Sequence, residues 1–172
     1  MTDLSGNGAS NGAQPSPPTG PSFAVNAQYI KDLSFESPNI IRIMTQQGGT
    51  PEVSFNLGVQ ANPVGPESFE VTLSVRAEAK RDAMVGFIVE LAYAGIFTLS
   101  GIPQDQVEPL LFIEAPRLLF PFARAIVADL TRDGGFTPLM LQPIDFVDLY
   151  RRKLAERQGQ SGITPAPANL DS

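Results

Sequence analysis

The sequence predicts an α+β fold in which a four-stranded antiparallel sheet is followed by two helices. Three segments in the first half of the chain alternate apolar and polar side chains, which is typical of strands with one buried face. Two segments in the second half have helix-forming content instead. Strands that precede helices in this way indicate the α+β class.

The composition indicates one domain between two tails. The chain has 172 residues, of which 42% are hydrophobic, and this suits a single core. Residues 1–21 and 159–172 are rich in Gly, Ser, Asn, Pro and Ala, so they bury too little apolar surface to offset the entropy of ordering. We therefore expect disordered tails at 1–21 and 159–172 and a folded domain at 22–158.

The first predicted strand lies in "YIKDLSFESPN", residues 29–39. Successive side chains of a strand point to opposite faces. One face should therefore carry Tyr29, Lys31, Leu33 and Phe35, and the other should carry Ile30, Asp32, Ser34 and Glu36.

Three further strands are predicted before residue 100. "PEVSFNLGVQ" (51–60) and "FEVTLSVRAEAK" (69–80) alternate, with a proline-containing turn between them. "MVGFIVELAYAGIFTL" (84–99) is apolar on both faces, so both of its faces need cover. We expect the four strands to form a meander.

The two predicted helices follow a Gly-Ile-Pro turn at 101–103. The first, within 116–135, ends in two glycines suited to a C-cap and is apolar nearly all round, which predicts a subunit interface. The interface candidates are Leu119, Phe122, Ile126 and Leu130. The second helix, within 145–158, should begin with Asp145 as its N-cap.

The residue types exclude several classes of function. The chain has no Cys and no His, so it lacks a thiol nucleophile, a histidine base and the usual zinc ligands. A net charge of −6 and a pI near 4.6 argue against binding to nucleic acid. No segment resembles a signal peptide or reaches the roughly 20 apolar residues of a membrane span. We expect a cytoplasmic protein without membrane insertion.

The acidic residues of the first strand are too far apart for paired catalysis. Asp32 and Glu36 are separated by about 13 Å along a strand, whereas glycosidase carboxylates lie roughly 5 to 9.5 Å apart. Two interpretations stay open: a solvated strand face, or an acidic docking surface for a basic partner. Glu90, beside Ile88 on the outward face of the fourth strand, would extend such a surface.

An apolar connection precedes the second helix. Leu139, Met140 and Leu141 lie between two prolines in "GGFTPLMLQPIDF", residues 134–146. These side chains could belong to the core, or they could form one wall of a hydrophobic groove.

Five segments in order resemble the SecB family of bacterial protein-export chaperones. They are "YIKDLSFESPN", "PEVSFNL", "GIFTLSGI", "LLFPFAR" and "FTPLMLQPIDF". The resemblance implies a homotetramer, a dimer of dimers, that binds unfolded preproteins in hydrophobic grooves and delivers them to the SecA motor ATPase. It implies neither enzymatic activity nor a cofactor.

The resemblance also implies roles for individual residues. The positions that match the flat, acidic SecA-docking face are Asp32, Glu36, Ile88 and Glu90. The positions that match the client groove are Val53, Phe55, Leu57, Leu139 and Leu141, with Tyr150 as a further candidate from the second helix.

Two other functions remain as alternatives. One is a SecB-like chaperone dedicated to a single partner, such as the antitoxin of a toxin–antitoxin pair. The other is an α+β protein that uses the apolar groove as a small-molecule pocket, and carboxylates, Ser and Lys would then supply any chemistry.

Overall fold

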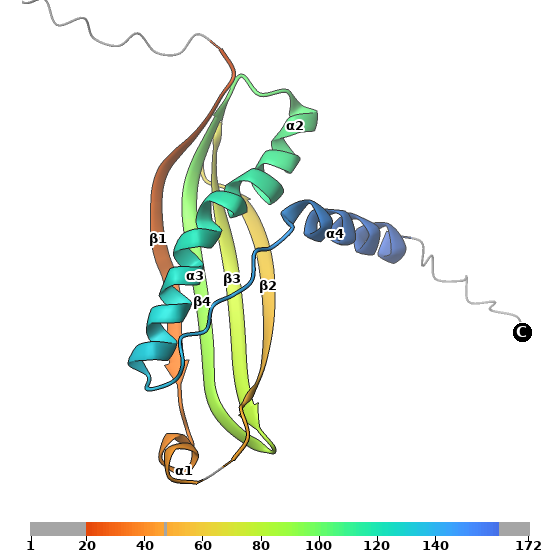
Figure 1. Cartoon of the computed structure of the whole chain (residues 1–172). Helices are drawn as coiled ribbons and strands as arrows, with labels where there is room; N and C mark the ends of the chain where they lie inside the picture. Colours follow the sequence, from red (N-terminus) through yellow and green to blue (C-terminus); the bar gives the residue numbers. More distant parts are fainter. Residues whose placement is uncertain (1–19, 47, 162–172) are drawn as a thin grey trace, which may run out of the picture.

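The computed structural model describes residues 20–46 and 48–161. Four strands form one antiparallel sheet: β1 (Ser22–Glu36), β2 (Glu52–Pro63), β3 (Ser68–Arg81) and β4 (Met84–Ser100). Figure 1 shows one face of this sheet covered by the long helix α3 (Ala115–Asp133), with α4 (Phe146–Ser161) beside the β2 edge. Most residues of the two predicted tails lie outside the described residues, and α4 continues to Ser161.

The antiparallel sheet is confirmed, but its strand order is not a complete meander. The order is β1-β4-β3-β2, so β2, β3 and β4 follow one another as predicted while β1 pairs with β4. The connection after β1 contains the short helix α1 (Ile40–Thr45) and passes the end of the sheet from one edge to the other (Figure 1). It spans three strand spacings, about 14 Å.

A β-bulge changes which β1 side chains share a face. Ile30 pairs with Tyr93 and Asp32 pairs with Ala92, so Lys31 is an extra residue in β1. An extra residue of this kind reverses the alternation beyond it. The predicted division of this strand is therefore wrong on one side of the bulge.

The bulge places Ile30 on the α3 side of the sheet together with Leu33 and Phe35. Its partner Tyr93 belongs to the row of β4 residues that is buried under the helix. Tyr29 lies on the opposite face, where its hydroxyl reaches Glu70 of β3. Asp32 and Glu36 are also on this opposite face, as predicted, because their partners Ala92 and Ile88 alternate with the buried row.

The helical layer that covers the sheet is one bent segment. It consists of α2 (Gln104–Pro109), one π-helical turn η1 (Leu110–Glu114) and α3. The predicted C-cap is confirmed: the Gly134 N–H donates to the Leu130 carbonyl at 2.8 Å, and Gly135 adopts a φ of 85°. The predicted N-cap of α4 is confirmed as well, since Asp145 Oδ1 accepts the N–H groups of Val147 and Asp148.

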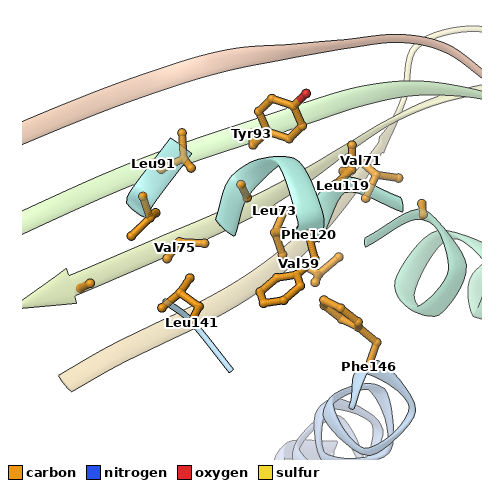
Figure 2. Packing of buried hydrophobic residues seen from close by; sticks show 14 of the residues in the cluster. Val59, Val71, Leu73, Val75, Leu91, Tyr93, Leu119, Phe120, Leu141 and Phe146 are labelled. Carbon is orange, nitrogen blue, oxygen red and sulfur yellow. The ribbon is translucent and has the colours of Figure 1, made fainter. Parts of the chain in front are cut away.

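The core lies between α3 and the central strands (Figure 2). Leu119 on α3 is 0% exposed, and a Cβ atom at Gly95 of β4 would lie only 3.0 Å from its Cδ2. The missing side chain at Gly95 thus allows the helix to approach the sheet. Phe120 and Phe146 meet edge to face, with ring centroids 5.9 Å apart, and join α4 to the same core.

The connection between α3 and α4 is fixed to the helix by a buried hydroxyl. Thr131 is 0% exposed, and its Oγ1 accepts the N–H of Leu139 at 2.8 Å while donating back to the Val127 carbonyl at 2.9 Å. This arrangement holds Leu141 against the core, where it is 2% exposed. The connection therefore has a defined path past β2 and β3.

Candidate functional site

The four predicted docking residues come together on the face of the sheet that α3 leaves open. Glu36 pairs with Ile88, and the residue between Asp32 and Glu36 on this face, Ser34, pairs with Glu90. We call Asp32, Glu36, Ile88 and Glu90 the acidic face. Because β1 and β4 are neighbours, the non-meander strand order is what makes this face continuous.

The charges of the acidic face are only partly balanced. Glu90 forms an ion pair with Arg76, which lies directly opposite on β3. Within the described part of the chain, no ion pair involves Asp32 or Glu36, and both side chains are exposed. A shallow hollow on this face is lined in part by Asp32, Arg76 and Glu90. Such a surface can attract a basic partner.

A second charge cluster on this face lies beyond the bulge. Lys31 Nζ and the Tyr29 hydroxyl both donate to the Glu70 carboxylate, at 2.6 and 2.5 Å. These hydrogen bonds, first from Lys31 and then from Tyr29, hold the pKa of Glu70 below its ordinary value. The bond to Glu70 in turn raises the pKa of Tyr29. The alternation of β1 gives no sign of this cluster, because it depends on the bulge.

The predicted groove residues of β2 lie on the α3 side of the sheet, at its other edge. Val53, Phe55 and Leu57 pair with Ala79, Ala77 and Val75, whose side chains belong to the core. Val53 and Phe55 are 41% and 42% exposed, whereas Leu57 is half-buried. Two apolar side chains thus remain on the surface beside the core.

Leu57 and Tyr150 line the same hollow between β2 and α4, and its volume is about 520 Å³. A neighbouring hollow is lined by Phe55, Leu57 and Leu149. The structure therefore brings Phe55, Leu57 and Tyr150 together, as the groove hypothesis requires. We call these two adjoining hollows the β2–α4 groove.

The two predicted groove residues of the connection differ in exposure. Leu139 is half-buried and packs against the core. Leu141 is 2% exposed and lies on the α3 side of the sheet, near Val75 (Figure 2). Leu141 is therefore a core residue, because the Thr131 bonds hold the connection close to the helix.

Lys153 of α4 and Phe112 of η1 also line the groove, and both were missed from the sequence. Lys153 Nζ donates to the Val59 carbonyl of β2 at 2.8 Å and sits 4.3 Å from the centre of the Phe112 ring. Burial, and then the nearby Arg157, lowers the pKa of Lys153. Burial, and then Glu108, raises the pKa of Tyr150, whose ring stacks on Phe112. Only the packing of α4 against both β2 and η1 identifies these partners.

The predicted interface residues of α3 divide between the core and the surface. Leu119 is fully buried against its own sheet, so it is unavailable to another subunit. Ile126 and Leu130 are half-buried and pack on the core. Phe122 is 51% exposed and stacks on Tyr93, and the neighbouring Leu118 is 43% exposed.

The exposed apolar surface continues from α3 onto β1. Tyr93 contacts Phe122 on one side and pairs with Ile30 of β1 on the other. Ile30 is exposed, and so is Leu33 on the same face of β1. We call Leu118, Phe122, Ile30 and Leu33 the α3–β1 patch. A contiguous exposed apolar patch is a candidate interaction surface.

Neither a cluster of metal ligands nor a membrane-spanning helix is found among the described residues. No group of three acidic side chains in residues 20–46 and 48–161 is arranged to hold a metal ion. Among the helices that the structure describes, none has the length and apolar character needed to cross a membrane.

The comparisons with known proteins agree on one family. The family model "Preprotein translocase subunit SecB" matches residues 16–157. The chain is 51% identical over 152 residues to the protein-export protein SecB of Rhodopseudomonas palustris (strain BisB5), covering 88% of this chain and 96% of the relative. It is 53% identical over 143 residues to the SecB of Paramagnetospirillum magneticum, covering 83% and 92%.

Among solved structures, the chain is similar to a SecB-like chaperone of Mycobacterium tuberculosis in complex with a peptide from the HigA1 antitoxin. The TM-score is 0.53 at 17% sequence identity, and the match covers 71% of this chain and 90% of that one. At this identity the likeness establishes a shared fold.

Proposed function

Because the chain belongs to the SecB family, we propose that it is a cytoplasmic export chaperone that binds unfolded preproteins and delivers them to SecA. The observation that carries the proposal is the separation of two surfaces. The acidic face lies on the open side of the sheet near β1, and the β2–α4 groove lies at the β2 edge. A client and a motor protein would therefore contact different side chains, and the hollow of the acidic face meets the groove at Leu57 and Gly58, which line both.

The proposed client site is the β2–α4 groove together with exposed Val53. Unfolded chains expose apolar side chains, and burial of this surface gives about 25 cal/mol per Å² without sequence specificity. A protein that binds the unfolded state opposes folding by mass action. The role therefore requires neither catalysis nor a cofactor.

The client site is tested by replacing Val53 and Phe55 together by Ser. Both side chains are about two-fifths exposed, so the variant should fold. We expect weaker capture of a denatured protein, measured by fluorescence anisotropy, with unchanged subunit assembly. Val64→Ser is the matched control, because Val64 is an exposed apolar residue outside β2. Equal capture by the folded double variant and the control would remove these residues from the client site.

The proposed SecA site is the acidic face. Exposed charges act mainly on encounter and are screened over about 8 to 10 Å at physiological salt. Asp32 and Glu36 offer carboxylates that no described cation neutralises, and Ile88 adds a half-buried apolar side chain between them and β3. Added salt should therefore weaken binding of SecA.

The decisive experiment reverses Asp32, Glu36 and Glu90 to Lys and titrates purified SecA by calorimetry. Attraction becomes repulsion at each position, so binding should be lost while client capture persists. The matched control reverses three acids of the helical layer, Glu114, Asp129 and Asp133, which changes the net charge equally. A folded variant of the acidic face that binds SecA as tightly as the parent would leave this face as solvated sheet surface only.

We also propose that the chain assembles as a homotetramer through the α3–β1 patch. Leu118 and Phe122 on α3 continue into Ile30 and Leu33 on β1, and a single chain leaves them about 37 to 51% exposed. β1 is in addition an edge strand, and an uncovered edge strand is open to pairing with another chain.

A further inference from the structure

The acidic face contains its own basic residue. Arg76 of β3 and Glu90 of β4 are directly opposite in the antiparallel register, and Arg76 Nη1 contacts Glu90 Oε1. Both side chains are about half exposed, at 46% and 50%. Among the described residues, Glu90 is thus the one predicted docking carboxylate whose charge is balanced by a neighbouring cation.

The position of Arg76 brings it into competition with a docking partner. It lines the same shallow hollow as Asp32 and Glu90, so it stands at the concavity that a side chain of the partner would enter. A carboxylate oxygen that accepts from one guanidinium is less available to a second cation. Arg76 also places a positive charge beside the incoming basic surface, and this repels it.

We propose that Arg76 is an internal counterion of Glu90 that a basic partner surface must displace, so that Arg76 limits the affinity of the acidic face. The proposal deepens the proposed SecA docking and rests on it for the identity of the partner. The competition itself depends only on the basic chemistry of the partner.

The first test is Arg76→Gln, titrated with SecA by calorimetry at low and physiological salt. The free energy of an exposed ion pair corresponds to at most about a fivefold change in affinity. We therefore expect binding roughly two- to fivefold tighter than the parent, with the gain shrinking as salt rises. Arg76→Lys keeps the charge and should stay close to the parent.

Arg117→Gln is the matched control, because the Arg117–Glu114 pair has nearly the same exposure, 46% and 45%, but lies on the helical layer. Both variants make the formal net charge one unit more negative than −6. Equal effects of the two substitutions would mean that net charge alone is responsible, and this would overturn the proposal. Unchanged or weaker binding by Arg76→Gln would overturn it as well.

A double-mutant cycle tests whether Arg76 acts through Glu90. In a Glu90→Gln background, Arg76→Gln should gain clearly less affinity than in the parent. If Arg76→Gln increased the affinity by the same factor in both backgrounds, this would contradict the counterion role.

A heptalysine peptide separates this proposal from the docking of SecA. If SecA fails to bind the parent chain, the proposed delivery function fails, yet the peptide still reports on the competition. Heptalysine should bind Arg76→Gln more tightly than it binds either the parent or Arg117→Gln. Equal peptide affinity for all three proteins would overturn the counterion proposal.

Discussion

Leu119 and Leu118 are adjacent on α3, yet they should respond to truncation in opposite ways. Leu119 is 0% exposed and packs over Gly95, whereas Leu118 is 43% exposed. Leu119→Ala removes three buried carbon atoms and leaves a cavity, which costs about 2 to 5 kcal/mol. This is a large fraction of the roughly 5 to 15 kcal/mol that stabilises an ordinary domain.

The assay is urea unfolding followed by circular dichroism. With a urea slope of about 1 to 3 kcal/mol per M, a loss of about 3 kcal/mol lowers the midpoint by roughly 1 to 3 M. Leu118→Ala should change the stability of the isolated subunit by about 0.5 kcal/mol or less. Assembly makes stability depend on concentration, so each variant is measured over a dilution series.

Leu119 stabilises the fold and Leu118 belongs to the proposed interface, and the dilution series can refute both statements. A midpoint of Leu119→Ala that matches the parent at every concentration would show that Leu119 is not a core residue. A loss for Leu118→Ala that equals the loss for Leu119→Ala at the greatest dilution would show that its effect is not one of assembly.

Three further outcomes are expected. Phe122→Asp should split the assembly in light scattering, because an unpaired charge buried between subunits costs several kcal/mol; a parent that is monomeric at micromolar concentration would contradict the interface. Glu70→Gln should reduce the free energy of unfolding at pH 7 by about 1 kcal/mol, and this lowers the urea midpoint. Because the pKa of Glu70 is lower in the folded state than its ordinary value of 4.5, its contribution is complete above pH 4.5 and is lost as the pH falls through the folded pKa. Parent and variant should therefore converge in acid. Lys153→Met removes the bond to the Val59 carbonyl and should speed amide hydrogen exchange in α4, measured by mass spectrometry, whereas Arg152→Met, which loses only a pair with Asp148 within the helix, should not.

The local elements of the fold could be predicted because their signals are local. The alternation in 51–60 and 69–80 gave strands β2 and β3, and the glycines after Asp133 and the carboxylate of Asp145 mark helix ends that the structure confirms. Each of these signals depends on residues within a few positions of one another. The grouping of Asp32 with Glu36, and of Ile88 with Glu90, has the same origin, since side chains two or four residues apart share a strand face.

The partners of these elements depend on contacts between distant parts of the chain. Alternation does not distinguish β2 from β4 as the neighbour of β1, so the meander order was wrong where the connection through α1 crosses the sheet. The bulge at Lys31 is likewise invisible in the alternation, because it exists only in the register between β1 and β4. It moves Ile30 to the α3 side and Tyr29 to the side of Glu70.

The exposure of apolar side chains likewise depends on contacts between distant parts of the chain. An apolar helix face and an apolar connection were evident in the residue types, but Leu119 and Leu141 became core residues while Leu118 and Phe122 stayed on the surface. The hydrophobicity of a side chain predicts that burial lowers the free energy, but it does not predict which surface buries that side chain. Periodicity and end signals in the chain thus specified the strands, the helices and the faces of each. The packing of β1 against β4, and of α3 against the sheet, selected which carboxylates share a surface, which cation opposes them and which leucines remain for a partner.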